Sequence, residues 1–259
     1  MGIMLCIFTT AGHPTIEKSV KALQILDDAG IDLIEIGVPF SDPLADGPVI
    51  QKSSFTALKN GVNLDKVFEI IQEARKGRKP QKSNNAFGKK GLDNVILFSY
   101  YNPLYSYGFD KLIEKCLENN VRGALIPDLP MDEAKELNEK FKAKGLDLVQ
   151  LAAPTSTKER EKAICEMSSP FVYLVSRVGV TGGSQNLDNG GLKEHIKNLK
   201  ANTKNPIGLG FGIDSPEKVK EALALGADMA IIGSKTVKLL EEDQTKDLKE
   251  FQKFILSLK

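Results

Sequence analysis

Short apolar segments alternate with longer amphipathic segments along the whole chain. Polar or glycine-rich turns follow the apolar segments, as is typical of buried strands. The predicted strands are Met4–Phe8, Leu33–Gly37, Val95–Tyr100, Gly123–Ile126, Leu146–Leu151, Phe171–Val175, Pro206–Gly210 and Met229–Ile232. The first predicted helix begins after Thr15, its N-cap, and ends at about Ala29. A short helix is predicted to begin at Ser234. The other predicted helices are Gln51–Lys59, Leu64–Lys76, Phe109–Asn119, Met131–Lys144, Thr157–Met167, Leu192–Lys200, Ser215–Leu225 and Thr245–Leu258.

This alternation predicts an α/β protein with a parallel sheet. Eight strand–helix units in 259 residues favour a closed (β/α)8 barrel, the TIM barrel, over an open doubly wound sheet. A dinucleotide-binding fold would carry G-x-G-x-x-G after its first strand, and Thr9–Pro14 does not supply it. Because no linker or change of composition divides the chain, we expect residues 1–259 to form a single domain.

One segment interrupts the pattern between the Leu64–Lys76 helix and the next strand. Residues 76–93 are rich in lysine and arginine and poor in apolar side chains. A basic patch for an acidic partner is one interpretation, but a solvated, mobile insertion is more typical of this composition. Because the segment joins a helix to a strand, it belongs at the N-terminal end of the barrel, away from the end where such barrels carry their chemistry.

Composition and charge exclude several functional classes. The formal net charge of +1 gives no reason to expect nucleic acid or an anionic membrane as a partner. No apolar run approaches the roughly 18 residues of a membrane span, and we see no signal-peptide pattern. Three isolated cysteines in apolar contexts suggest packing roles in a reducing compartment, so we expect a cytoplasmic protein. With two histidines and no metal-ligand spacing, a metal site is not expected.

Two carboxylates stand out where the second strand ends. Glu35 interrupts an apolar strand, and burying an acid is costly unless it is paired or neutralised. It could reach solvent at the strand end, pair with a cation, or serve as a catalytic group. The proline-rich loop that follows carries Asp42 and Asp46, either of which could instead satisfy loop backbone as an Asx-turn residue.

The other strand ends predict a substrate site. Three glycine clusters, at 179–183, at 208–212 and at Gly233-Ser234, follow the last three strands, where this fold frequently binds phosphate. The aromatic residues Phe8, Tyr100 and Tyr173 would enclose the space above them, although such residues could also be barrel core. Together these features suit a planar apolar substrate with a phosphorylated tail, cleaved by acid–base chemistry.

The chain resembles the tryptophan synthase α subunit family over essentially its whole length. The segment at 35–51, a strand glutamate followed by G-V-P-F-S-D-P-L-A-D-G-P-V-I-Q, is similar to the family signature. Further resemblances are the T-A-G-H-P turn at 10–14, Y-Y-N-P at 100–103, P-D-L-P at 127–130, A-P-T-S at 153–156, and the loops at 176–182, 208–213 and 233–234. The chain differs in having only three residues before its first strand, where family members usually begin with a helix.

The resemblance implies a carbon–carbon lyase of tryptophan biosynthesis that cleaves indole-3-glycerol phosphate to indole and glyceraldehyde 3-phosphate. It implies that Glu35 is the catalytic acid–base and that Asp46 hydrogen-bonds the indole N–H. The positions that would contact substrate, including the tyrosine near the glycerol chain, the loop threonine that closes over the site, and the phosphate loops, are Phe8, Tyr100, Tyr173, Thr181, Gly182, Phe211, Gly212, Gly233 and Ser234.

The resemblance also implies a partner. Family members usually pass indole to a β subunit that holds pyridoxal phosphate, in an α2β2 assembly, so no cofactor is expected in this chain. Three alternatives stay open: a stand-alone indole-3-glycerol phosphate lyase, a non-catalytic regulatory subunit that binds phosphate, and a generic phosphosugar barrel. The presence of both Glu35 and Asp46 argues against the regulatory subunit, and the long signature argues against the generic barrel.

Overall fold

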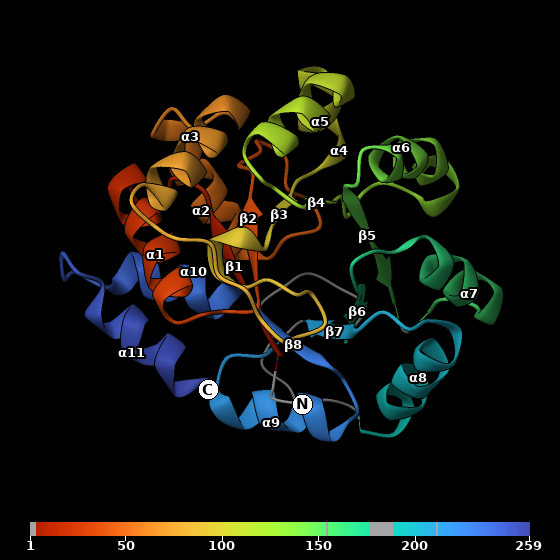
Figure 1. Ribbon diagram of the computed structural model, residues 1–259. Coiled ribbons are helices and arrows are strands. Elements are labelled where there is room, and N and C mark those ends of the chain that lie inside the picture. The colour runs from red at the N-terminus through yellow and green to blue at the C-terminus, as the bar shows by residue number, and fades with distance from the viewer. Residues whose placement is uncertain (1–3, 154, 177–188, 211) are drawn as a thin grey trace.

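The computed structural model describes residues 4–153, 155–176, 189–210 and 212–259. Within these ranges parallel strands close into a barrel in sequence order, with the first strand beside the last, which confirms the predicted fold (Figure 1). The strands are β1 (Met4–Thr10), β2 (Leu33–Gly37), β3 (Val95–Phe98), β4 (Gly123–Leu125), β5 (Asp147–Ala152), β6 (Val172–Val175), β7 (Ile207–Gly210) and β8 (Met229–Ile232).

Helices surround the barrel on its outside (Figure 1). They are α1 (Ile16–Asp28), α2 (Pro48–Lys59), α3 (Leu64–Arg75), the short 3-10 helix η1 (Gly91–Asp93), α4 (Tyr101–Tyr107), α5 (Phe109–Glu118), α6 (Met131–Ala143), α7 (Lys158–Met167), α8 (Asn189–Asn202), α9 (Pro216–Ala224), α10 (Ser234–Glu242) and α11 (Lys249–Ser257). The predicted N-cap of α1 is confirmed, since the Thr15 side chain accepts a hydrogen bond from the Lys18 N–H at 3.2 Å.

The strands are buried on both faces, as the continuous apolar runs predict. In β1 every residue is buried. Leu5 and Ile7 belong to the large cluster that packs the helices onto the barrel, whereas Met4 and Cys6 belong to the smaller cluster inside the barrel. Alternate residues of each strand therefore belong to two different hydrophobic cores, one between barrel and helices and one inside the barrel. The core inside the barrel continues up to the level of Glu35.

The third strand ends earlier than the sequence indicates. We expected a strand over Val95–Tyr100 and a loop after it, but β3 ends at Phe98 and residues 101–107 form α4. Asp128, in the loop after β4, stabilises the start of α4: its Oδ1 accepts the Tyr101 N–H at 2.8 Å, which satisfies a donor in the first turn of the helix. Sequence pattern alone does not show such a cap, because its two residues belong to different strand–helix units.

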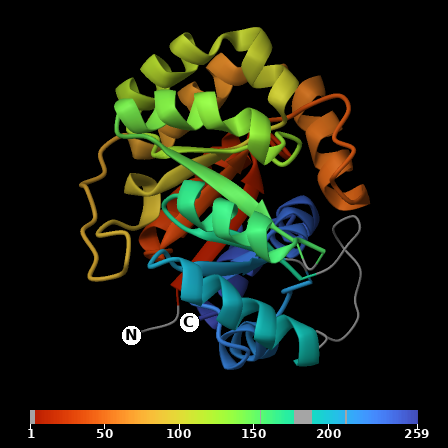
Figure 2. The ribbon, with the colours of Figure 1, turned by 90° about the vertical axis from the view of Figure 1, so that its right-hand side faces the viewer.

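The basic segment 76–93 lies at the N-terminal end of the barrel, as predicted, and Figure 2 shows it as an extended gold loop at the edge of the molecule. Arg78 Nη1 pairs with Asp27 and Asp28 of the α1 helix at 2.7 Å each, and Asn85 Nδ2 donates to Asp32 Oδ1 at 2.7 Å. Phe87 is buried and joins the cluster inside the barrel. The segment thus covers this end, and its mobility stays a prediction.

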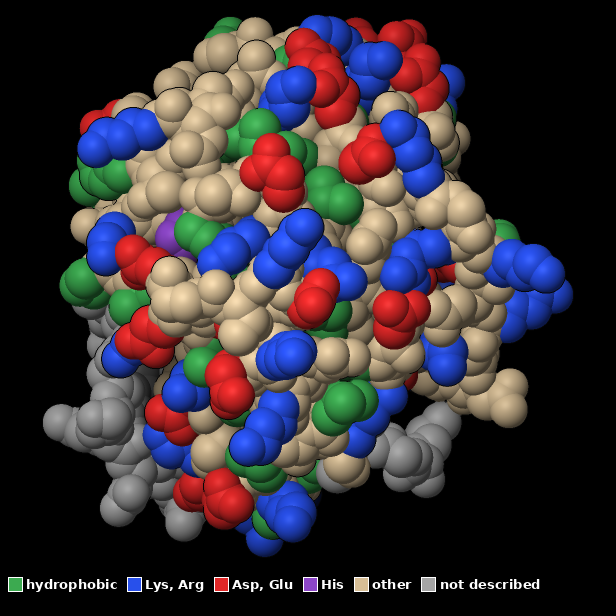
Figure 3. All heavy atoms as spheres, turned by 90° about the vertical axis from the view of Figure 1, so that its left-hand side faces the viewer, with side chains coloured by type: hydrophobic (Ala, Val, Ile, Leu, Met, Phe, Trp, Pro, Cys, Tyr) green, Lys and Arg blue, Asp and Glu red, His purple; other side chains and the backbone are tan. Residues whose placement is uncertain are grey.

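The surface carries both signs of charge. On the side that Figure 3 shows, Lys and Arg side chains are intermingled with Asp and Glu side chains. On this face the mixture fits the net charge of +1. None of the helices in the described ranges combines the length and apolar composition that a membrane span requires.

Candidate active site

Glu35 lies inside the barrel near the C-terminal end of β2. The register places it between Phe8 of β1 and Ile96 of β3. Its side chain is 1% exposed, and among the described residues its Oε1 atom has no hydrogen-bond partner. Burial raises the pKa of the Glu35 carboxyl to about 8, and a hydrogen bond with the Cys6 side chain opposes that rise. A solvent-exposed Glu35 does not fit this environment, and no ion pair joins Glu35 to a cation within the described part of the chain.

Asp46 lies in the loop between β2 and α2 and is 6% exposed. The Tyr100 hydroxyl donates to Asp46 Oδ2 at 3.0 Å and accepts the Ala45 N–H at 2.9 Å. Burial raises the pKa of Asp46 to about 6, with the Tyr100 hydrogen bond acting in the opposite direction. Tyr100 was predicted to enclose the site with its aromatic ring. Its hydroxyl group also holds the Asp46 loop through these two hydrogen bonds.

The two carboxyl groups differ in protonation at neutral pH. A pKa of about 8 keeps Glu35 largely protonated, whereas a pKa of about 6 leaves Asp46 largely ionised. Two acids with separated pKa values can divide acid–base work, since one group can donate a proton while the other stabilises positive charge. Asp42 differs from both, because it is exposed and pairs with the neighbouring Ser41 hydroxyl.

Aromatic side chains enclose the space around Glu35. The Phe8 ring meets the Phe98 ring edge to face, with centroids 5.4 Å apart. Tyr173 is buried on β6, and its pKa is raised by burial first and by the negative charge of Glu35 second. The Tyr173 ring lies so close to Gly210 that a Cβ atom there would be 2.3 Å from its hydroxyl oxygen. Glycine at position 210 thus makes room for this ring.

Sequence reasoning missed two residues of this group. Phe98 ends β3 and faces Phe8, although its place at a strand end, next to Tyr100, was a usable signal. Cys6 was assigned to packing alone, yet the nearby Glu35 carboxyl group helps to raise the pKa of its thiol. Its place two residues before Phe8 puts it on the same face of β1, which alternation along a strand could have indicated.

The structure describes some of the residues that were predicted to bind phosphate. Gly233 is the N-cap residue of α10, and Ser234 is the first residue of that helix, so backbone N–H groups and the positive end of the helix dipole face this position. Gly212 has φ = +77°, a conformation that favours glycine. The predicted site residues Thr181, Gly182 and Phe211 lie outside the described residues.

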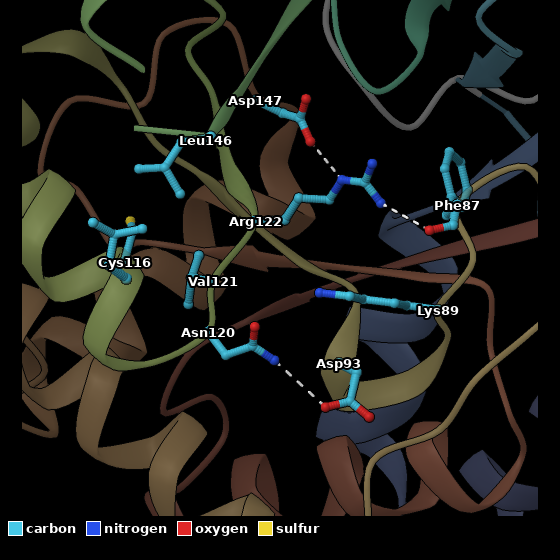
Figure 4. A pocket seen from close by; sticks show the side chains of 11 residues that line it. Phe87, Lys89, Asp93, Cys116, Asn120, Val121, Arg122, Leu146 and Asp147 are labelled. Carbon is cyan, nitrogen blue, oxygen red and sulfur yellow. Dashed lines mark hydrogen bonds and ion pairs between the residues drawn. The ribbon is translucent and has the colours of Figure 1, made fainter. Parts of the chain in front are cut away.

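A separate cleft of about 260 Å³ lies at the opposite end of the barrel (Figure 4). Arg122 pairs there with Asp147, donates to Asn94 Oδ1 at 3.1 Å, and lies over the Phe87 ring at 5.5 Å from its centroid. None of the predicted site residues lines this cleft. Within the described residues, no group of three or more His, Cys, Asp or Glu side chains is arranged to hold a metal ion.

Comparison with known proteins identifies the family. The family model of the tryptophan synthase alpha chain matches residues 3–259. The tryptophan synthase alpha chain of Microcystis aeruginosa is 42% identical over 253 residues, which cover 97% of this chain and 90% of that one. The alpha chain of Arabidopsis thaliana is 39% identical over 259 residues, which cover 99% and 89% of the two chains.

Solved structures agree with the sequence relatives. A structure from the Pyrococcus furiosus tryptophan synthase α2β2 complex superposes with a TM-score of 0.85 at 33% identity and covers 98% of this chain and 97% of that one. A chain of tryptophan synthase from M. tuberculosis gives a TM-score of 0.82 at 28% identity, with 99% and 91% covered. On the match of nearly the whole sequence and on the barrel it forms, this chain belongs to the tryptophan synthase alpha chain family.

Proposed function

We propose that this chain is the α subunit of a tryptophan synthase and cleaves indole-3-glycerol phosphate to indole and glyceraldehyde 3-phosphate. The observation that carries the proposal is the pair of buried carboxyl groups, one protonated and one ionised at neutral pH, at the C-terminal end of the barrel. A retro-aldol cleavage of this substrate needs a proton donor for a ring carbon and a negative charge near the indole nitrogen.

Glu35 serves both proton transfers in this mechanism. Its carboxyl group gives a proton to the indole ring carbon that carries the glycerol chain, and the resulting carboxylate then accepts the proton of the adjacent side-chain hydroxyl. As that proton leaves, the hydroxyl carbon becomes an aldehyde, the carbon–carbon bond breaks, and its electron pair restores the aromatic indole. Glu35 ends in its starting state. We assign the contact with the substrate to Oε1, which is buried and has no hydrogen-bond partner within the ranges that the structure describes.

Asp46 stabilises the intermediate between the two steps. Protonation of the ring carbon places positive charge on the indole nitrogen, and the Asp46 carboxylate accepts the N–H hydrogen bond there. The Tyr100 hydroxyl, at 3.0 Å from Asp46 Oδ2, keeps the carboxylate oriented. The apolar rings of Phe8 and Tyr173 would enclose the indole and exclude water, which strengthens this charge interaction.

The phosphate group of the substrate would bind at the C-terminal opening of the barrel. The N-terminus of α10 at Gly233 and Ser234, together with Gly212, offers backbone donors to the phosphate. We assign Thr181, Gly182 and Phe211 to the same end of the substrate on the family resemblance alone. No lysine is needed for this mode of phosphate binding, because backbone N–H groups and the helix dipole supply the positive potential.

The partner would be a tryptophan synthase β subunit, in an α2β2 assembly like the one described for the Pyrococcus furiosus relative. Leu44 is 82% exposed in the loop after β2, at the mouth of the barrel, and is a suitable apolar contact for it. Pyridoxal phosphate would then belong to the β subunit, and this chain would hold no cofactor of its own. The free, buried cysteines fit a cytoplasmic complex.

The test is indole release by the purified chain, measured while a β subunit is titrated in. We expect slow turnover alone and a rise with the β subunit, because partner docking completes closure of the site. Leu44→Asp should weaken that rise, whereas Leu256→Asp, at an exposed leucine on α11 remote from the mouth, should not. Rapid turnover that ignores the β subunit would favour the stand-alone lyase, and an absence of indole under all conditions would contradict the lyase function.

A further inference from the structure

Thr236 lies in the first turn of α10 and is completely buried. The helix packs against β1 and against α2 (Figure 1). The Thr236 hydroxyl lies between two backbone carbonyl oxygens, 2.7 Å from that of Phe8 in β1 and 2.5 Å from that of Gly233, the N-cap residue of α10. With its single proton the hydroxyl can donate to either oxygen, so one side chain connects the start of α10 to β1.

This contact lies where the sheet no longer joins β1 to β8. The register between the two strands ends with Ile7 opposite Ile232, and the chain then turns directly into α10. Beyond that last pair, the position of α10 relative to β1 depends on side chains. The Thr236 hydroxyl supplies a hydrogen bond to the Phe8 carbonyl, and Val237 shares an apolar cluster with the Phe8 side chain. The helix is thus attached to β1 at the level of Phe8.

Phe8 lies beside the predicted acid. It is opposite Glu35 in the β1–β2 register, and its ring meets the Phe98 ring at the space around that carboxyl group. On the other side of the contact, the N-cap residue of α10 is Gly233, which has no side-chain oxygen to occupy the first N–H groups of the helix. The Thr236 hydrogen bond therefore connects the predicted phosphate donors to the strand next to the acid.

We propose that Thr236 is a positioning residue for the phosphate group of the substrate: its hydrogen bond to the Phe8 carbonyl fixes the N-terminus of α10 at a set distance from the pocket around Glu35. This inference rests on the proposed function, which takes the N-terminus of α10 as the phosphate site. The hydroxyl itself is occupied by backbone carbonyl oxygens and acts through the helix. A substrate that joins a planar group to a phosphate requires a constant distance between the two subsites, because a displacement of about 1 Å can prevent productive alignment.

The test is a calorimetric titration of glycerol phosphate into the full chain and its variants. Thr236→Val keeps the shape of the side chain and removes the hydroxyl, so the affinity should fall by about three- to tenfold, the range expected when one buried hydrogen bond is lost. Thr236→Ser keeps the hydroxyl and should bind glycerol phosphate as the wild type does. Should Thr236→Val fail to fold, Thr236→Ala removes the same hydroxyl and carries the test.

Ser53 provides a matched control on the neighbouring helix. It is completely buried in α2, and its hydroxyl lies 2.6 Å from that of Thr10, which joins α2 to the same end of β1. Ser53→Ala should reduce stability in urea denaturation, as Thr236→Val does, but it should leave the affinity for glycerol phosphate unchanged, because α10 keeps its hydrogen bond. A wild-type affinity in Thr236→Val and Thr236→Ala, or an equal loss of affinity in Ser53→Ala, would overturn the proposal.

Turnover separates this inference from the proposed function. With indole-3-glycerol phosphate as substrate, Thr236→Val should raise KM more than it lowers kcat, because the hydroxyl affects phosphate binding and not the proton transfers. Weakened glycerol phosphate binding in Thr236→Val, with no indole released by the wild type, would retain the role of Thr236 and reject the lyase. Indole release together with an unchanged affinity in Thr236→Val would retain the lyase and reject the role of Thr236. A wild-type chain that does not bind glycerol phosphate would reject both the phosphate site and this role.

Discussion

Glu35, at the C-terminal end of the barrel, differs in its hydrogen-bond partners from the buried carboxyl groups at the N-terminal end. At the N-terminal end Asp27 accepts the Leu92 N–H at 2.9 Å and pairs with Arg78, and Asp32 accepts the Leu5 N–H at 2.9 Å. At the C-terminal end Glu35 has one oxygen that no other described residue contacts by a hydrogen bond, and burial raises the pKa of this group. Partners therefore stabilise the carboxyl groups at the N-terminal end, whereas Glu35 keeps its proton at neutral pH.

This difference separates stability from chemistry within one fold. Paired carboxylates at the N-terminal end tie the 76–93 segment to α1 and close the barrel. A carboxyl group without a full set of partners contributes nothing comparable to stability, but it can exchange a proton with a ligand. The same substitution, carboxylate to amide, should therefore have different consequences at the two ends.

The largest effect is expected for Glu35→Gln. The amide keeps the volume of the side chain and removes the titratable proton, so indole release should fall by about 10³-fold or more, while the fold is kept. Single-turnover and steady-state assays, with circular dichroism as the folding control, measure both quantities. Turnover within tenfold of the wild type would remove Glu35 from the mechanism.

Asp46→Asn should reduce turnover by about 100- to 1,000-fold, because an amide cannot supply negative charge beside the indole nitrogen. Its side-chain oxygen can still accept the Tyr100 hydroxyl, so the loop should keep its shape. Asp42→Asn is the matched control in the same loop, since Asp42 is exposed. If Asp42→Asn proves the more damaging change, the two aspartates have been assigned the wrong way round.

The pH dependence of stability should change with Glu35. Its folded-state pKa of about 8 is above the ordinary value of 4.5, so the unfolded chain loses this proton at lower pH than the folded chain. Any stability that the protonated group contributes is present below pH 4.5 and is lost as the pH rises towards 8. Relative to Glu35→Gln, the wild type should lose on the order of 5 kcal/mol of unfolding free energy over this interval, measured by urea denaturation. A constant difference across that interval would contradict the raised pKa.

Asp27→Asn tests the other end. It removes the charge that pairs with Arg78 but keeps an oxygen for the Leu92 N–H, so we expect a loss of about 1–3 kcal/mol in unfolding free energy. Indole release by the folded protein should stay within about twofold of the wild type, because Asp27 lies far from the mouth. An Asp27→Asn variant with normal stability and impaired turnover would contradict the assignment of stability to the N-terminal end and of chemistry to the C-terminal end.

The smallest effect is expected for Gly233→Val. The nearest atoms to a Cβ at this position would be those of Phe8, at 3.6 Å or more, so the fold should tolerate the change. The larger side chain should obstruct the approach of phosphate to the N-terminus of α10 and weaken glycerol phosphate binding by about tenfold. Calorimetry measures that affinity, and an unchanged value would place the phosphate elsewhere.

Patterns local in the sequence predicted the barrel and the position of Glu35. Alternating strands and helices set the fold, and an acid in an apolar strand is visible without a structure. The contacts that define the site were not visible, because they join residues far apart in the chain: Tyr100 reaches Asp46 across 54 positions, and Asp128 caps α4 across 27. The roles of Glu35 and Asp46 themselves stay predictions from family resemblance.

The close approach of Tyr173 to Gly210 has a consequence for how this sequence can diverge. The two residues lie on neighbouring strands, and a Cβ atom at position 210 would collide with the tyrosine ring. A lineage could enlarge residue 210 only after residue 173 had become smaller, and a relative that keeps the tyrosine should also keep the glycine. The two positions should therefore covary among related sequences, with the order of substitution constrained by the shared space.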